Sequence, residues 1–257
     1  MSAISFSVYE WHNYRAKDFV PFRDHDGKKC FPTDDSIMTL AVLKALLKSE
    51  NAEELPSQAV HCLQEVGRPY PHCGFGGHFY GWIYSDYPEP YHSFGNGAAM
   101  RVSPAAYFAN SLGEAEALAE CVTAITHNHP EGIKGARITA GLCYLALTGK
   151  SREELREYAE RFYRLDFTID EIRPSYRFNV TCMETVPQAV EAFLESTDFE
   201  DALRTAISVG GDSDTLAAIT CGIAGAFYGV PEYFYEKAVS FLDHRLLSIL
   251  REFEARA

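Results

Sequence analysis

Apolar residues recur along most of the chain with the spacing of a helix. In residues 35–49 they stand at i, i+3, i+4, i+7 and i+8, and further apolar residues fill the other faces. A helix that is apolar on every side is a buried helix, so we expect this segment at the centre of the fold. Its main stripe is Met38, Ala41, Val42, Ala45 and Leu46, and the other faces carry Ile37, Leu40, Leu43 and Leu47.

The same period, together with start and stop signals, predicts helices over most of the remaining sequence. Ser103 followed by proline begins one helix, and Ser151 with Glu154 forms a capping box that begins another. We expect a strand at residues 176–182 and a long ordered loop at 69–93. No repeat or linker divides the chain, so we predict an all-α fold in a single domain, 1–257. The other predicted helices cover residues 118–129, 135–147, 186–196, 200–209, 216–226 and 232–256.

Charge and composition exclude several classes of protein. With 23 basic and 36 acidic residues, the formal net charge of −13 repels nucleic acid, so a protein that coats DNA or RNA is excluded. The longest weakly polar stretch, 216–230, is shorter than the roughly 20 residues that span a bilayer, and residues 1–10 lack a signal-peptide pattern. The seven cysteines include no C-x-x-C pair, so we expect neither disulfides nor zinc. These features predict a cytoplasmic protein without membrane contact.

Two short acidic clusters each stand where a loop becomes an apolar helix. One is Thr33-Asp34-Asp35, and the other is Asp212-Ser213-Asp214-Thr215. Helix capping explains any single one of these residues, because Thr and Asp are favoured N-cap residues. Four carboxylates before two buried helices, however, would repel one another unless a cation compensated them. Their all-oxygen ligand set fits Mg²⁺, Mn²⁺ or Ca²⁺ and does not fit zinc.

A glycine-containing segment and a pair of histidines lie between these clusters. Residues 93–101 carry the glycines of a Gly-Asn-Gly turn, whose backbone N–H groups could surround a phosphate, although an ordinary turn has the same pattern. His127 and His129 stand on a tight turn at a predicted helix end. We expect at least one of them simply to stabilise that end.

Five short segments of this kind follow one another along the chain. They are Val8-Tyr9-Glu10, Thr33-Asp34-Asp35-Ser36, Gly95-Asn96-Gly97-Ala98-Ala99-Met100-Arg101, Thr126-His127, and Gly210-Gly211-Asp212-Ser213-Asp214-Thr215. In this order they resemble the ADP-ribosylglycohydrolase family, which contains dinitrogenase-reductase-activating glycohydrolase and the ADP-ribosylhydrolases. The resemblance covers nearly the whole chain, from about Ser7 to Glu232. It implies a compact orthogonal helical fold with a binuclear metal centre in a cleft that binds ADP-ribose.

Carried over residue by residue, the resemblance implies a complete site. It implies a diphosphate cradle at the glycine loop, a nucleotide contact from the histidine and, from the aromatic residue, a surface on which adenine can stack. Glu10 matches an acidic residue that reaches the metal site or the ribose, although residues 1–6 lack the glycine-rich start usual in the family. The implied ligands of two Mg²⁺ or Mn²⁺ ions are Thr33, Asp34, Asp35, Asp212, Asp214 and Thr215. The implied substrate contacts are Ser93, Phe94, Gly95, Asn96, Gly97, Met100, Arg101 and His127.

The resemblance implies hydrolysis of the glycosidic bond between ADP-ribose and an acceptor, either a protein side chain or a small molecule. Asp35 is the first candidate for the base that accepts the proton of water, and Glu10 is the alternative. Two other functions stay open: a non-catalytic ADP-ribose-binding or crystallin-like structural protein, and a metal-dependent hydrolase of the diphosphate. His129 has no assigned role.

Overall fold

The structure, a computed structural model, describes residues 15–18 and 30–256. All regular elements in these ranges are helices, and their only β feature is an isolated bridge between Gly95 and Thr181. The predicted all-α class is therefore confirmed. In chain order the helices are α2 (Asp34–Lys48), α3 (Leu55–Gly67), α4 (Gly77–Tyr84), the 3₁₀ turn η1 (Asn96–Ala98), α5 (Ala105–Phe108), α6 (Leu112–Ala124), α7 (Pro130–Leu147), α8 (Arg152–Glu160), α9 (Ile169–Ile172), α10 (Cys182–Leu194), α11 (Phe199–Val209), α12 (Ser213–Tyr228), α13 (Glu232–Ser240) and α14 (His244–Glu254).

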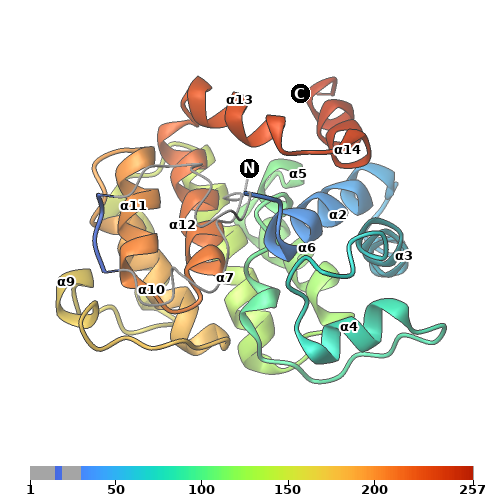
Figure 1. Ribbon diagram of the computed structural model, residues 1–257, viewed down its shortest axis with the longest axis horizontal. Helices are drawn as coiled ribbons and strands as arrows, with labels where there is room; N and C mark the ends of the chain where they lie inside the picture. Colours follow the sequence, from blue (N-terminus) through green and yellow to red (C-terminus); the bar gives the residue numbers. More distant parts are fainter. Residues whose placement is uncertain (1–14, 19–29, 257) are drawn as a thin grey trace.

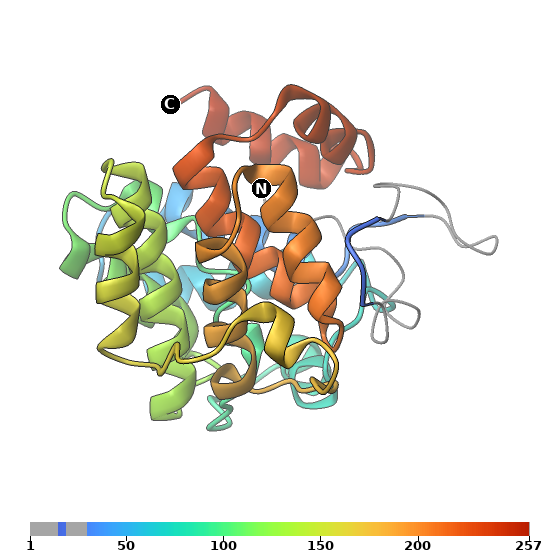
Figure 2. The same ribbon diagram turned by 90° about the vertical axis from the view of Figure 1, so that its left-hand side faces the viewer.

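The helices form two groups that meet in the middle of the molecule. Figure 1 shows α10, α11 and α12 together on one side and α2, α3 and α4 on the other, with α6 and α7 between them. In Figures 1 and 2, α13 and α14 lie across one end, where α14 packs on α2. The contacts between α2 and α12 join the two groups.

Helices α2 and α12 supply the centre of the core. Twelve of the 15 residues of α2 are buried, which confirms the prediction that this helix is surrounded. Of the first 12 residues of α12, all but Asp214 are buried. One cluster of buried apolar side chains extends along the chain from Cys30 to Leu250. None of the seven cysteines forms a disulfide, as expected, and none of the described helices is long and apolar enough to cross a membrane.

The structure corrects the predicted elements at several places. Residues 176–182 do not form a strand, because their only ladder contact is the single bridge at Thr181. The expected loop at 69–93 contains helix α4, and the expected helix at 232–256 is divided in two. Asp243 makes this division, because its carboxylate accepts from the backbone N–H groups of Arg245 and Leu246 and so begins α14. Helices α3 and α9 were not predicted.

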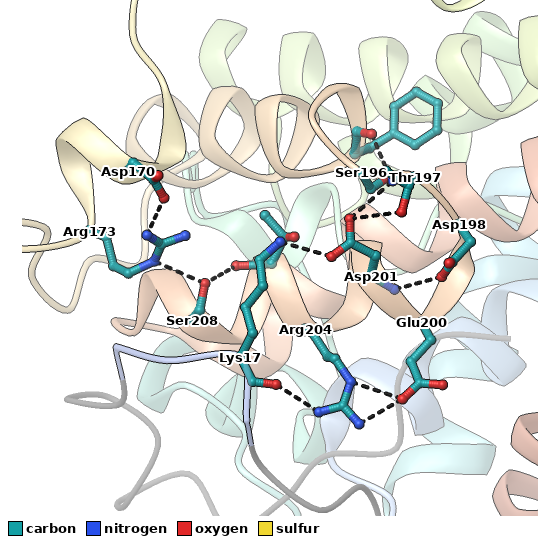
Figure 3. Close-up of polar contacts among 12 residues, drawn as sticks. Lys17, Asp170, Arg173, Ser196, Thr197, Asp198, Glu200, Asp201, Arg204 and Ser208 are labelled. Carbon is teal, nitrogen blue, oxygen red and sulfur yellow. Dashed lines mark hydrogen bonds and ion pairs between the residues drawn. The ribbon is translucent and has the colours of Figure 1, made fainter.

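The segment 15–18 is fixed to helix α11, far from it in sequence (Figure 3). Lys17 Nζ forms an ion pair with Asp201 Oδ1 at 2.8 Å, and the backbone carbonyl of Lys17 accepts from Arg204 at 2.7 Å. The Arg204 guanidinium also pairs with Glu200 on the same helix. Arg15 donates to the carbonyl of Tyr176 at 3.0 Å. These contacts bring the beginning of the described chain to the group formed by α10, α11 and α12.

Candidate active site

The amino ends of α2 and α12 meet, which brings the two acidic clusters together. The Thr215 hydroxyl donates to Asp35 Oδ1 at 2.9 Å across 180 positions of sequence. The Thr33 hydroxyl donates to the other oxygen, Oδ2, at 3.1 Å. Asp35 is 1% exposed, so two hydroxyl groups from opposite sides of the fold hold a fully buried carboxyl group.

The side chains at these two helix starts do not cap their helices. Neither Thr33, the N-cap residue of α2, nor Asp212, the N-cap residue of α12, accepts a hydrogen bond from its own helix. The first N–H of α2, that of Asp34, donates instead to the backbone carbonyl of Cys73 at 3.0 Å. The capping interpretation of these residues therefore does not hold, and their oxygens face the site.

The carboxyl groups of the site destabilise one another's charged forms. Burial, reinforced by the charge of Asp214, raises the pKa of Asp34 to about 7. The pKa values of Asp35 and Asp212 are raised well above their usual range by the same two causes, burial first. The charge of Arg101 acts in the opposite direction and lowers the pKa of Asp34. The site thus holds more negative charge than the described residues compensate.

The glycine loop is tied directly to the second acidic cluster. Asn96 donates through Nδ2 to Asp212 Oδ2 at 2.7 Å and to the Thr185 hydroxyl at 3.2 Å. Most of the loop's amides already donate within the chain: Gly95 N to Ser93 Oγ, Asn96 N to Val180 O, Ala98 N to Gly95 O, and Ala99 N and Met100 N to Asn96 O. Within the predicted cradle at residues 93–97, the N–H groups of Gly95 and Asn96 are thus already engaged, and diphosphate binding by this loop stays a prediction.

A buried chain of three polar side chains lies beneath this loop. Arg101, 1% exposed, donates through Nη2 to the Thr126 hydroxyl at 2.7 Å, and that hydroxyl lies 2.7 Å from His127 Nδ1. The Thr126 hydroxyl also donates to Thr123 O at 3.3 Å, and its contact with Nδ1 fixes which way the imidazole ring faces. Burial, with the nearby Arg101, lowers the pKa of His127 well below its usual range, which keeps the ring neutral.

His127 Nε2 points to the two glycines of the loop. A Cβ atom at Gly97 would lie 3.4 Å from Nε2, and one at Gly95 would lie 3.5 Å from it. The structure thus brings His127 and the loop together, as predicted. Arg101 lies in the core, where its guanidinium also faces the Phe79 ring at 5.3 Å, and Met100 is buried with its carbonyl near Thr39. Contacts of Arg101 and Met100 with substrate stay predictions.

Phe94 forms an exposed aromatic surface at the edge of the loop. Its side chain is 44% exposed, and its ring meets the His129 ring edge-on at 5.2 Å between centroids. His129 also begins helix α7, because its Nδ1 accepts from the N–H of Glu131 at 3.1 Å. The expected helix-stabilising histidine is therefore His129, and it acts at the start of a helix and not at its end.

Comparison with known protein families identifies the family of this chain. The family model for ADP-ribosylglycohydrolase matches residues 6–251. The chain belongs to the ADP-ribosylglycohydrolase family. Its enzyme class is accordingly that of glycosidic-bond hydrolases.

Individual members of the ADP-ribosylglycohydrolase family show moderate similarity to the chain. It is 26% identical over 280 residues to ADP-ribosylhydrolase ARH3 of Mus musculus, covering 84% of this chain and 75% of that protein. It is 33% identical over 144 residues to ADP-ribosyl-[dinitrogen reductase] glycohydrolase of Rhodospirillum rubrum, covering 54% of this chain and 47% of that protein. A solved structure, described as an ADP-ribosylglycohydrolase-related protein complex, has a TM-score of 0.63 at 22% identity and covers 94% of this chain and 92% of its own. This last likeness shows the fold.

As in the sequence prediction, the oxygens of this ADP-ribosylglycohydrolase suit a hard cation, but they do not enclose one. Within residues 15–18 and 30–256, no three His, Cys, Asp or Glu side chains stand in an arrangement that could hold a metal ion. Several carboxyl oxygens bond instead to Thr33, Thr215 and Asn96. The oxygen donors and the uncompensated negative charge fit a divalent cation. The described side chains, however, are not arranged as the coordination shell of such an ion. Metal binding stays a prediction.

Sequence reasoning missed some residues that shape the site. Gly211 has a φ of +67°, and a Cβ atom there would overlap the ring of Tyr176. Tyr176 therefore fixes the chain immediately before Asp212, and no sequence signal identifies it. Thr126 was noted only beside His127, and its bridge to Arg101 depends on the fold. Glu10 lies outside the described residues, so its place in the site stays a prediction.

Proposed function

We propose that the protein hydrolyses the glycosidic bond between C1 of the distal ribose of ADP-ribose and an acceptor. The acceptor is a nitrogen or oxygen of a protein side chain or of a small molecule. One observation carries this proposal. Four carboxyl groups meet at the starts of α2 and α12, and the N-cap side chains there accept no hydrogen bond from their own helices. The four residues are Asp34, Asp35, Asp212 and Asp214. Family membership and the names of the relatives support the same reaction class.

Two Mg²⁺ or Mn²⁺ ions are part of the proposal. Their ligands would be the carboxylates of Asp34, Asp35, Asp212 and Asp214 and the hydroxyls of Thr33 and Thr215, because hard cations prefer such oxygens. When bound, such ions orient ribose hydroxyls and lower the pKa of water. The raised pKa values of Asp34, Asp35 and Asp212 support this assignment, since they mark negative charge that the chain itself leaves uncompensated.

Asp35 is the proposed acceptor of the water proton. The oxygen of water forms a bond to C1, the bond from C1 to the acceptor atom breaks, and that atom leaves with the electron pair. Thr33 and Thr215 hold the two oxygens of Asp35 from opposite sides and so fix the plane of its carboxyl group. Glu10 is the alternative base.

The nucleotide would lie along the glycine loop. We assign Phe94 as the surface on which adenine stacks, because it is the exposed ring at the loop's edge. His127 would donate to the diphosphate through Nε2–H, which faces the loop at Gly95 and Gly97. Asn96 links this part of the site to the carboxylates through its bond to Asp212.

Product analysis tests the reaction. The purified protein is incubated with Mg²⁺ or Mn²⁺ and with ADP-ribosyl-arginine or ADP-ribosyl-serine, and the products are separated by chromatography. Release of intact ADP-ribose is expected from at least one substrate. Calorimetric binding of ADP-ribose without release would identify a binding module, and appearance of AMP would identify hydrolysis of the diphosphate; either result would contradict the proposal.

A further inference from the structure

A cavity of about 440 Å³ lies beside the site, between helix α4 and the loop that follows it. In Figure 1 these segments form one edge of the molecule, at the end opposite α13 and α14. The reaction proposed above does not use this cavity. Its lining includes His78, Trp82, Ser85, Pro88, Glu89 and Tyr91.

Tyr91 lies between the cavity and the glycine loop. Its ring is 5.8 Å from the His127 ring and 5.8 Å from the His78 ring, between centroids. Its backbone N–H donates to Thr126 O at 3.2 Å, and it stands two residues before Ser93. Tyr91 thus lies between the cavity and His127, which places the cavity next to the proposed substrate site.

The chemistry of the cavity favours a cation. Residues 69–92 contain no lysine or arginine, whereas Asp86 and Glu89 are exposed there and aromatic rings are dense. The nearest preceding arginine, Arg68, is held by the protein itself, since it donates to the backbone carbonyls of Ile83 at 2.8 Å and Ser85 at 3.2 Å. A carboxylate among aromatic faces is a favourable environment for a guanidinium or ammonium group.

The wall of the cavity is held in place by helix α3. Gln64 Nε2 donates to the carbonyl of Ser85 at 2.9 Å, and the Tyr84 hydroxyl donates to the carbonyl of Arg68 at 2.8 Å. The Trp82 ring stacks on Phe79 at 5.6 Å with an interplanar angle of 15°. A ligand therefore meets preformed aromatic surfaces and needs to order little of the protein.

We propose that this cavity binds an arginine side chain of the acceptor polypeptide, next in sequence to the ADP-ribosylated residue. The guanidinium would lie against Trp82 and Tyr91 and pair with Glu89, because a planar cation both stacks on rings and forms directed bonds to a carboxylate. This inference rests on the proposed function, since it gives the hydrolase a preference for basic acceptor sequences.

Binding is tested first without any reaction. Agmatine, a small guanidinium compound, is titrated into the W11F variant, in which Trp82 is the one tryptophan left. Its emission is expected to change on binding, and E89Q is expected to weaken the affinity about 5- to 10-fold. The matched control is E236Q, an exposed charge on α13, which should leave the affinity unchanged. No emission change, or equal affinity with E89Q, would overturn the proposal.

A second measurement links the cavity to substrate choice. Two peptides carry ADP-ribose on the same residue and differ only in a neighbouring arginine or glutamine. The wild type is expected to prefer the arginine peptide about 10-fold in kcat/KM, mainly through KM, and E89Q should remove the preference. Equal rates for both peptides would overturn the cavity proposal. Release from neither peptide would refute the proposed hydrolase instead, and the agmatine titration would then decide on the cavity alone.

Discussion

The amino ends of the helices fall into two groups that use the same residue types differently. At α6, α8, α9, α11 and α14, the N-cap side chains of Ser111, Ser151, Thr168, Asp198 and Asp243 accept hydrogen bonds from the first turn. Among the described helices, the serine, threonine and aspartate N-caps that do not cap are Thr33, Thr181 and Asp212. Thr33 and Asp212 belong to the two acidic clusters of the candidate active site, and Thr181 forms the bridge to Gly95 of the glycine loop.

The absence of N-cap hydrogen bonds at Thr33 and Asp212 makes the candidate active site less stable than the other helix starts. An N-cap side chain contributes about 1 kcal/mol to stability, so the site gives up a few kilocalories in caps before its charge repulsion is considered. Residues that break a local rule of helix formation without replacing it by another stabilising contact are expected at functional sites. Here they mark the site without reference to any relative.

The largest expected effect is on activity, and it distinguishes the helix starts of the candidate active site from the capped helix starts. The variant Asp35→Asn should lower hydrolysis about 10²- to 10⁴-fold, because it removes the proposed proton acceptor while keeping the shape of the side chain. Circular dichroism should show an unchanged helix content. Asp198→Asn, which changes a capping carboxylate of α11, should keep wild-type turnover. Near wild-type turnover by purified D35N would remove Asp35 from this role.

A second variant tests how the backbone presents Asp212. Gly211→Ala combines a positive φ with overlap of the Tyr176 ring, so we expect a loss of about 2–4 kcal/mol in urea denaturation and lower activity. Gly149 is the matched control, because its φ is +77° and nothing lies within 4 Å of a Cβ atom there. Gly149→Ala should lose about 1–2 kcal/mol and keep its activity. Equal effects of both substitutions would contradict a special role for Tyr176.

Chelation and a rise in pH should both lower stability at the helix starts that carry Asp34, Asp35 and Asp212. The folded pKa of Asp34, about 7, exceeds its unfolded value near 3.9, and those of Asp35 and Asp212 shift in the same direction. The native state then binds more protons, so this contribution is fully present below about pH 4 and is lost as the pH rises toward the folded pKa values.

The expected result follows for protein treated with EDTA. Without metal its melting temperature should be lower at pH 7.5 than at pH 5.5, and its activity should be absent. Mg²⁺ or Mn²⁺ should raise the melting temperature, and more so at pH 7.5, where the carboxylates are charged. Calorimetry at both pH values measures this. An enzyme whose activity ignores EDTA would contradict the binuclear centre.

The smallest expected effect compares two threonines at helix starts. Thr168→Ala removes a cap of α9 and should cost about 1 kcal/mol in urea denaturation, with unchanged activity. Thr33→Val keeps the volume, removes the bond to Asp35 and loses no cap, so it should lower kcat with a smaller change in stability. The opposite pattern would mean that Thr33 is a structural residue.

The meeting of the two acidic clusters could be predicted from sequence, because both clusters stand before apolar helices. Two acidic clusters before apolar helices pointed to a shared site, and the bond from Thr215 to Asp35 now joins them. The central position of α2 was predictable from its apolar faces, and the start of α8 from its capping box. These features depend on local sequence.

What could not be predicted depends on contacts distant in sequence. Whether Thr33 caps α2 is decided by Cys73 O, which satisfies the first N–H of that helix in its place. In the glycine loop at residues 93–97, the N–H of Asn96 is engaged by Val180 O, a contact across more than 80 positions that the local sequence does not indicate. The sequence predicts a loop at residues 69–93, whereas the stacking of Phe79 on Trp82 stabilises helix α4 within this segment.

The bond between Thr215 and Asp35 has a consequence for synthesis on the ribosome. The two residues are 180 positions apart, and translation adds about 5–20 residues per second, so Asp35 waits roughly 10 to 40 s for its partner. Lys17 waits a similar time for Asp201 on α11, 184 positions later. During this interval α2 can pack on α3, but its contacts with α12 cannot yet form. The nascent chain thus exposes α2, the first of the described helices, before its contacts with α12 can form, which makes α2 a segment where a chaperone would be expected to bind.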